Sequence, residues 1–176
     1  MALTEFFEHI GTEAMRDDTE ACRISEVSCY AIKAEKGDPN LDVITQIAVN
    51  SVGGEIGGIS LVQQSEIWLP STVGIDVTSI PRAGSFCTYA IQSGTSKIFE
   101  IEDASADSRF KFNPLVNHPN SFLHYAAVPI VGMHGYMLGT LWMMRRAPGR
   151  LSIDQADLFM EMAKVVVDTL ELRYST

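Results

Sequence analysis

The chain is 176 residues long and carries 13 lysines and arginines against 22 aspartates and glutamates, a formal net charge of -9 at pH 7. This length suits one domain, and the negative charge disfavours broad attraction to nucleic acids or anionic membranes. Hydrophobic residues make up 46% of the chain and charged residues 20%, which is the composition of a folded domain and not of a disordered one.

No targeting segment or cysteine framework is expected. The first 15 residues mix acidic side chains into every turn and lack both a basic start and a continuous apolar run, unlike a signal peptide. No later stretch reaches the ~18 apolar residues of a membrane-spanning helix, so we expect a soluble, cytoplasmic protein. The three cysteines form no CxxC pair, which argues against a disulfide framework or a zinc ribbon.

Three helices are expected before any strand. Apolar residues recur at three- and four-residue spacing over 3–14, which predicts an amphipathic helix. A second helix is predicted to begin at Thr19, to turn Ile24 and Val27 inward, and to end before residue 35. Asn40 is predicted to cap a third helix, whose inward face is formed by Leu41, Ile44, Ile47 and Ala48.

Short segments rich in β-branched and aromatic residues follow, and they predict five strands, at 57–64, 65–74, 96–103, 122–132 and 136–146. The last two are joined by a glycine-flanked link, which predicts an antiparallel hairpin. A short helix over 83–94 interrupts the run after the second strand. The glycines at 53–58 lack the lysine of a P-loop and precede a strand, so we expect them to make turns.

The last predicted helix carries two apolar stripes. Ser152 and Gln155 form a capping box at its start. One stripe consists of Phe159, Ala163, Val166 and Leu170. A second stripe has coiled-coil spacing and consists of Leu158, Met162, Val165 and Leu172. One stripe suits the sheet and the other suits another helix, so the pattern as a whole indicates an α+β domain.

Motifs for catalysis or metal binding are sparse. The four histidines, at 9, 118, 124 and 134, fit no short metal-ligand signature, and no metal is expected. Cys87 follows Ser85, a predicted helix N-cap, where a thiol can become reactive. The alternative is a small buried core residue, which we favour because no histidine or lysine adjoins Cys87 in the sequence.

The segment 103–121 is long, polar and rich in turn-forming residues, and such loops on a small sheet are usually functional. Its Arg109 either meets a carboxylate of a ligand or pairs with Asp103 or Asp107. Aromatic residues along the strands and connecting segments either line a pocket or belong to the core; they are Trp68, Phe86, Phe112, Phe122, Tyr125 and Trp142.

Three ordered blocks, 74–91, 103–116 and 136–152, resemble GAF domains, the small-molecule sensory modules of bacterial histidine kinases, cyclases and phosphodiesterases and of phytochromes. The resemblance covers about residues 41–173. It implies an α+β fold with a central antiparallel sheet of five to six strands. Helices would pack on one face of this sheet, and loops would enclose a pocket on the other.

The resemblance also implies domain boundaries and a site. Residues 1–40 would form an N-terminal helical extension, and 41–176 the GAF domain with a C-terminal dimerisation helix. By position in the family pattern, the ligand-binding residues would be Trp68, Ser85, Phe86, Cys87, Phe110, Asn113, Leu115, Tyr125, Ala127, Thr140 and Trp142.

The sequence departs from the family branch at three positions. Tyr89 stands where members commonly have a histidine, Trp142 where they have a cysteine, and Arg145 where they have an acidic residue. The Asn-Lys-Phe-Asp-Glu constellation of cyclic-nucleotide binders is absent, and the context of Cys87 does not match bilin carriers. Residues 103–121 also lack the cysteines used by free methionine sulfoxide reductases. The ligand therefore does not follow from the resemblance.

We expect a non-enzymatic sensory or regulatory domain that binds an unidentified small molecule without a cofactor and signals through helix rearrangement in a homodimer. No nucleic-acid or membrane partner is expected. Two alternatives stay open. One is a redox sensor or reductase that uses Cys87, and the other is a degenerate GAF module that acts only in dimerisation.

Overall fold

The computed structural model describes residues 19–31, 36–94, 97–119 and 121–174. Its six strands form one antiparallel sheet in the order β3-β2-β1-β6-β5-β4. The strands are β1 (Ile56–Val62), β2 (Glu66–Val73), β3 (Ser79–Pro81), β4 (Phe99–Ile101), β5 (His124–Val131) and β6 (Met137–Arg145). The predicted fold class, an antiparallel sheet of five to six strands with helices, is confirmed.

The strand pattern differs from the expectation mainly at β3, which was missed. This strand is three residues long and ends in a proline, so it offers almost no alternation to recognise. The expected hairpin between β5 and β6 is present. Gly132 N donates to Tyr136 O over 2.9 Å, and Gly135 has φ +84°, a backbone conformation that favours glycine.

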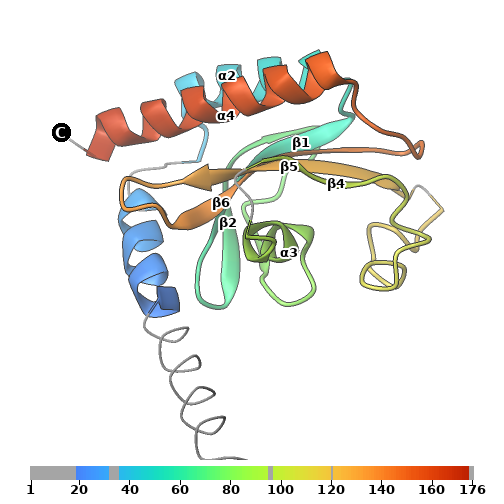
Figure 1. Ribbon diagram of the computed structural model, residues 1–176, viewed down its shortest axis with the longest axis horizontal. Helices are drawn as coiled ribbons and strands as arrows, with labels where there is room; N and C mark the ends of the chain where they lie inside the picture. Colours follow the sequence, from blue (N-terminus) through green and yellow to red (C-terminus); the bar gives the residue numbers. More distant parts are fainter. Residues whose placement is uncertain (1–18, 32–35, 95–96, 120, 175–176) are drawn as a thin grey trace, which may run out of the picture.

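The sheet separates two layers (Figure 1). Helices α2 (Pro39–Ser51) and α4 (Ile153–Tyr174) lie side by side on one face, and the short helix α3 (Phe86–Gln92) lies on the other. Two buried clusters correspond to these layers. One packs α2 and α4 on the sheet and includes Leu141 and Phe159, whereas the other packs α3 on the sheet and includes Phe86.

Helix α2 begins two residues earlier than predicted, because its N-cap is Asp38 and not Asn40. The Asp38 carboxylate accepts hydrogen bonds from Asn40 N (2.9 Å) and Leu41 N (3.1 Å), and Pro39 occupies the first helical position, where its missing N–H costs nothing. The prediction for Ile47 was also wrong. Its side chain is 54% exposed, close to the 58% of Val43 one turn earlier.

Helix α4 follows the predicted pattern closely. Ser152 N donates to Gln155 Oε1 (3.0 Å) and Gln155 N to Ser152 Oγ (3.1 Å), so the capping box is confirmed. All four residues of the first apolar stripe are buried. Of the second stripe, Leu158, Val165 and Leu172 are 44%, 42% and 72% exposed. An ion pair between Arg173 and Asp38 joins the end of α4 to the start of α2, so the two helices run antiparallel.

The glycines at 53–58 serve two purposes. Gly53 has φ +71° and belongs to the turn after α2, as expected. Gly57 and Gly58 lie inside β1, as the predicted strand 57–64 requires, and do not make a turn. A Cβ atom on Gly57 would lie 2.5 Å from Val49 Cγ2 and 2.6 Å from Trp142 O, which shows that glycine lets α2 and β6 approach β1 closely.

A further helix spans residues 19–31 and is called helix 19–31 below. Val27 is fully buried and Ile24 half-buried, as predicted. The helix predicted over 3–14 lies outside the described residues, and the boundary at residue 40 stays a prediction. No helix in the described part of the chain is long and apolar enough to cross a membrane.

Candidate functional site

A cavity of about 60 Å³, the central cavity, lies between the sheet and α3. Side chains from β2, β3, β5, β6, α3 and the 103–121 loop surround it. They are Leu69, Ile80, Ser85, Phe86, Cys87, Asn113, Leu115, Tyr125, Trp142 and Met144. None of these described residues carries a charged side chain, and most present apolar or aromatic surface.

Aromatic rings form a continuous stack along the central cavity. The rings of Phe110 and Phe86 lie parallel with centroids 4.0 Å apart, and Phe86 lies 4.8 Å from Tyr125. Tyr125 in turn stacks on Trp142 at 6.5 Å. The stack reaches from the loop, across α3, to the middle of the sheet, and it accounts for the small volume that remains.

Several polar atoms lie within this apolar surrounding. Tyr125 Oη donates to Cys87 Sγ over 3.6 Å, and burial raises the pKa of Tyr125 well above its usual value. The indole Nε1 of Trp142 is buried and has no hydrogen-bond partner. Because an unsatisfied buried N–H is costly, this atom is suited to an acceptor supplied by a ligand.

The start of α3 and the loop close the cavity from outside. Ser85 caps α3, and its Oγ accepts from Thr88 N over 3.2 Å. Asn113 holds the loop, because its Oδ1 accepts from Leu115 N (2.9 Å) and its Nδ2 donates to Gly84 O (3.3 Å). The second of these bonds ties the loop to the residue before the α3 cap, so the two covering segments are joined to each other.

Seven of the eleven predicted site residues line the central cavity: Ser85, Phe86, Cys87, Asn113, Leu115, Tyr125 and Trp142. Phe110 instead lies behind Phe86 in the aromatic stack. Ala127 pairs with Trp142 across β5 and β6. Thr140 lies two residues before Trp142, and its hydroxyl meets that of Ser60 at 2.7 Å.

Trp68 does not line the cavity, and its placement there needs correction. It is half-buried and packs on the cluster beneath α2 and α4, whereas its neighbour Leu69 faces the cavity. Between the pairs Ile59↔Ser71 and Leu61↔Trp68, strand β2 has one residue more than β1. Because of this bulge, the β2 residues before it point to the opposite face of the sheet from the one that simple alternation would predict.

Sequence reasoning missed Leu69, Ile80 and Met144. Met144 could have been found, because it lies two residues after Trp142 and therefore on the same face of β6. Ile80 belongs to the unrecognised strand β3, and Leu69 depends on the bulge.

Arg109 pairs with Asp107 and does not line the cavity. Its Nη2 and Nε atoms lie 2.7 Å from Asp107 Oδ2 and 3.0 Å from Oδ1. The side-chain hydrogen bond from Arg109 lowers the pKa of Asp107. The guanidinium also lies 5.1 Å from the ring centre of Phe110. Of the two interpretations of Arg109, the structure therefore shows the one in which it fastens the loop.

Cys87 is 5% exposed, which agrees with the interpretation as a small core residue. Cys22 and Cys29 both lie on helix 19–31, away from the cavity, with Cys22 exposed. Within the described ranges, no group of three histidine, cysteine, aspartate or glutamate side chains could hold a metal ion.

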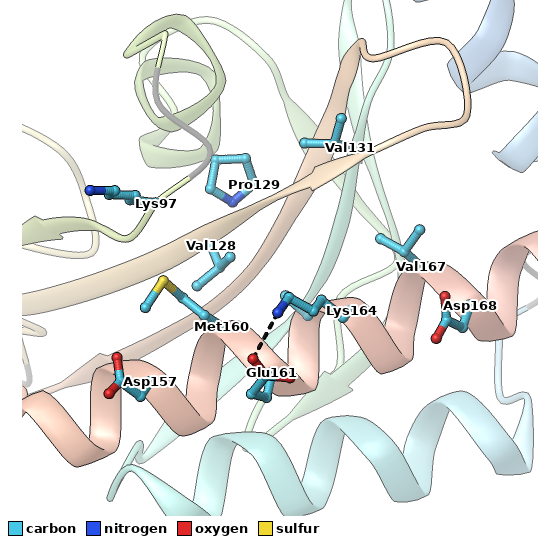
Figure 2. Close-up of a pocket in the computed structure, with 11 residues that line it drawn as sticks. Lys97, Val128, Pro129, Val131, Asp157, Met160, Glu161, Lys164, Val167 and Asp168 are labelled. Atoms are coloured by element: carbon cyan, nitrogen blue, oxygen red, sulfur yellow. Dashed lines mark hydrogen bonds and ion pairs between the residues drawn. The ribbon is translucent and has the colours of Figure 1, made fainter.

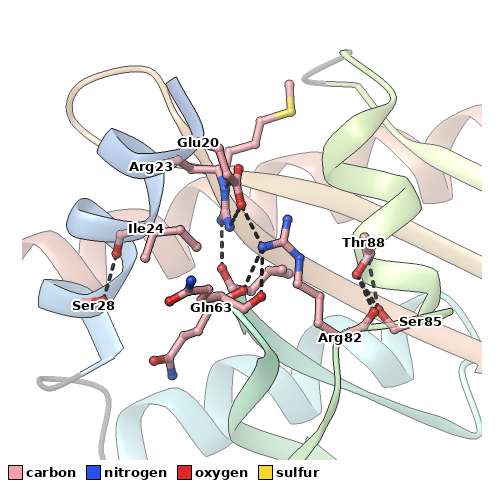
Figure 3. Close-up of polar contacts among 11 residues, drawn as sticks. Glu20, Arg23, Ile24, Ser28, Gln63, Arg82, Ser85 and Thr88 are labelled. Atoms are coloured by element: carbon pink, nitrogen blue, oxygen red, sulfur yellow. Dashed lines mark hydrogen bonds and ion pairs between the residues drawn. The ribbon is translucent and has the colours of Figure 1, made fainter. Parts of the chain in front are cut away.

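Recesses larger than the central cavity lie elsewhere on the described part of the chain, two of them beside helices. A groove of about 720 Å³ runs between β5 and α4, where Val128 faces Met160 and the charged pair Lys164–Glu161 stands at the rim (Figure 2). A recess of about 1230 Å³ lies beside helix 19–31, where Glu20 meets Arg23 and Arg82 (Figure 3). Both are open to solvent and polar at their edges.

No family model matches the chain. The chain is 29% identical over 160 residues to a Pseudomonas aeruginosa protein named cyclic di-GMP phosphodiesterase. The match covers 90% of this chain but only 27% of that protein, so the chain corresponds to a minor part of its relative.

Two solved structures illustrate the fold. The GAF domain of an Acinetobacter phosphoenolpyruvate-protein phosphotransferase superposes with a TM-score of 0.64 at 15% identity, covering 92% of this chain and 96% of that one. A type II free methionine-R-sulfoxide reductase from Thermoplasma acidophilum gives 0.63 at 14% identity, covering 80% and 94%. Several further neighbours are GAF domains, and the chain has the GAF-domain fold.

The expectation of a non-enzymatic protein is contradicted by these comparisons. The curated relative carries the name of a phosphodiesterase, and free methionine-R-sulfoxide reductases share the fold. The lack of a familiar catalytic motif in the sequence therefore does not separate this chain from enzymes.

Proposed function

We propose that this chain is a sensory domain that binds a compact, uncharged molecule in the central cavity and regulates a phosphodiesterase of the cyclic di-GMP class. The observation that carries the first part is the apolar, uncharged cavity under α3. One of its walls is Trp142, whose Nε1 is buried and has no hydrogen-bond partner. The second part is supported by the curated relative, most of whose length lies outside the match.

The chemistry of the lining supports an uncharged ligand. Moving a charge into an apolar site without a partner is strongly unfavourable, and the described lining residues offer no countercharge. A ligand with one hydrogen-bond acceptor would satisfy Trp142 Nε1, and a flat ring would extend the stack formed by Tyr125 and Phe86.

The cavity volume limits the size of the ligand. A cavity of about 60 Å³ has space for only a few heavy atoms, whereas drug-sized ligands occupy pockets of about 300 to 1,000 Å³. A cyclic dinucleotide is thus too large for the cavity in this conformation. A ligand as large as a single ring would need α3 and the loop around Asn113 to move outward.

The proposal includes a homodimer. The exposed residues Leu158, Val165 and Leu172 of α4, with Val43 and Ile47 of α2, present an apolar face on adjacent antiparallel helices. Covering such a face contributes about 25 cal/mol for each Å² of apolar surface removed from water. The two-helix face is therefore the surface on which we place the second copy.

A thermal-shift screen of uncharged metabolites tests ligand binding, using wild type, Trp142→Phe and Arg109→Ala. A binder at a hundredfold excess over its Kd stabilises the wild type by about 2.7 kcal/mol. Trp142→Phe keeps an aromatic wall but removes the donor, so we expect roughly tenfold weaker binding. Arg109→Ala should respond like the wild type. Equal shifts in all three proteins would place the ligand elsewhere.

Regulation is tested in the Pseudomonas aeruginosa relative after its matched region is replaced by this chain. We expect the rate of cyclic di-GMP hydrolysis by the chimera to change when a binder from the screen is added. At a binder concentration too low to saturate the Trp142→Phe variant, the rate of a chimera that carries Trp142→Phe should not change. A rate that never responds to the binder would contradict regulation. An assay of this chain alone measures any cyclic di-GMP hydrolysis that it catalyses itself.

A further inference from the structure

We propose that the ion pair between Glu20 and Arg82 transmits the state of the central cavity to helix 19–31. The inference rests on the proposed function, because a ligand bound in the cavity would be what changes the state of the cavity. It assigns a regulatory role to the contact in which Arg82 meets Glu20 of helix 19–31 (Figure 3).

Arg82 is bound firmly to the first turn of α3. Its carbonyl oxygen accepts hydrogen bonds from Ser85 N (3.2 Å) and Thr88 Oγ1 (2.9 Å). Ser85 and the two residues after it line the central cavity. An outward shift of α3 to admit a ligand would therefore carry the Arg82 backbone with it.

The side chain of Arg82 connects this turn to helix 19–31. Its Nη1 donates to Glu20 Oε1 over 2.7 Å and to Gln63 O, in the turn between β1 and β2, over 2.9 Å. Hydrogen bonds from Arg23, followed by those from Arg82, lower the pKa of Glu20 to about 2 despite partial burial. Glu20 is therefore a carboxylate at neutral pH, and it can hold a guanidinium.

The network allows the contact to open at small cost. Arg23 binds both oxygens of Glu20 (2.8 and 2.9 Å), so the carboxylate keeps a partner when Arg82 withdraws. The Glu20 side chain is 43% exposed, so water can replace Arg82. Arg23 itself is buried and donates to Val62 O over 2.8 Å, a contact with the sheet that does not involve Arg82.

The other end of helix 19–31 reaches the opposite layer of the protein. Tyr30 Oη donates to Glu171 Oε1 of α4 over 3.4 Å and accepts from Met133 N at the same distance. Helix 19–31 thus contacts the cavity side through Glu20 and the α4 side through Tyr30. A change at Arg82 has a contiguous physical route to α4, the helix on which we place the dimer contact.

The test fills the cavity without the natural ligand. Cys87→Met adds atoms to the cavity wall, and hydrogen–deuterium exchange of residues 19–24 reports local opening of helix 19–31 around Glu20. We expect exchange there to be about tenfold faster than in wild type, and equally fast in Arg82→Gln. The double variant should show no further increase, because both changes act through one contact. Arg146→Gln, which removes a distant ion pair with Glu55, serves as the matched control.

A second way of filling the cavity guards against misfolding of Cys87→Met. In a Cys22→Ser, Cys29→Ser background, the Cys87 thiol attacks methyl methanethiosulfonate, forms a disulfide that carries one methylthio group, and releases methanesulfinate. Unchanged exchange at 19–24 in the filled protein would overturn the proposal, as would an additive increase in the double variant. Neither readout involves the natural ligand, so their failure is distinct from failure of the thermal-shift screen.

Discussion

The indole of Trp142 and the phenol ring of Tyr125 stack across β6 and β5, with centroids 6.5 Å and ring planes 25° apart. Both side chains are buried, and both face α3. The rings that hold α3 on the sheet are thus also the walls of the central cavity. The packing of these rings therefore determines both the stability of this part of the core and the size of ligand that the cavity can hold.

The two substitutions at Trp142 should have unequal effects on stability. Trp142→Ala removes a buried ring and should cost about 3–5 kcal/mol of unfolding free energy. Trp142→Phe retains a ring and removes a donor that has no partner, so we expect a loss of only about 1 kcal/mol. Urea unfolding followed by circular dichroism gives both values. Equal losses would show that Nε1 has a partner in solution.

The contribution of Glu20 to stability should disappear in acid. The pKa of Glu20 in the folded protein is about 2 against an ordinary 4.5, so its ion pairs stabilise the fold above pH 4.5 and are lost as the pH falls toward 2. Because the side chain is partly exposed, we expect the difference between wild type and Glu20→Gln to be about 1 kcal/mol at pH 7. Denaturant titrations from pH 7 to pH 2 should show that difference shrinking. A constant difference would contradict the ion pairing.

The titration of His124 should make the stability of the fold depend on pH in a second, higher pH range. Burial lowers its pKa, although the hydrogen bond to Glu100 Oε1 (2.7 Å) opposes the shift. The unfolded chain therefore binds more protons than the folded protein below about pH 6.5, and stability should fall as the pH drops through that value. His124→Gln should remove this dependence between pH 7 and pH 5. The comparison isolates His124, because Glu20 does not titrate in that range.

The two-helix face should mediate dimerisation. Val165→Glu places a charge in the exposed apolar stripe and should convert the wild-type dimer to a monomer in light scattering at micromolar concentration. Lys164→Glu, at the adjacent groove, is the matched control and should remain dimeric. A wild type that is monomeric under the same conditions would exclude the dimer.

Local chemistry explains most of what the sequence predicted correctly. The capping box at Ser152, the Ser85 cap and the glycine-flanked hairpin each depend on residues a few positions apart, and each is present. The prediction for Trp68 was wrong because a bulge, which depends on pairing with another strand, turns the side chains of β2 before it to the opposite face of the sheet. The predicted cap, Asn40, was wrong because proline is well tolerated as the first helical residue, which makes Asp38 the cap.

The candidate site was only partly predictable for a similar reason. Residues near the α3 cap and on the last strands follow from the family pattern, whereas Leu69 and Ile80 depend on long-range strand pairing. The Glu20–Arg82 contact joins residues 62 positions apart, and nothing in either local sequence indicates it.

The most direct test of the central claim is native mass spectrometry after incubation with a small-molecule extract of bacterial cells and removal of unbound compounds. The wild type should carry one compact, uncharged molecule for each chain. Cys87→Met, in which the cavity is filled, should lose that molecule, while Arg109→Ala should retain it. A wild type that binds nothing, or a molecule held equally by Cys87→Met, would contradict ligand binding in the central cavity.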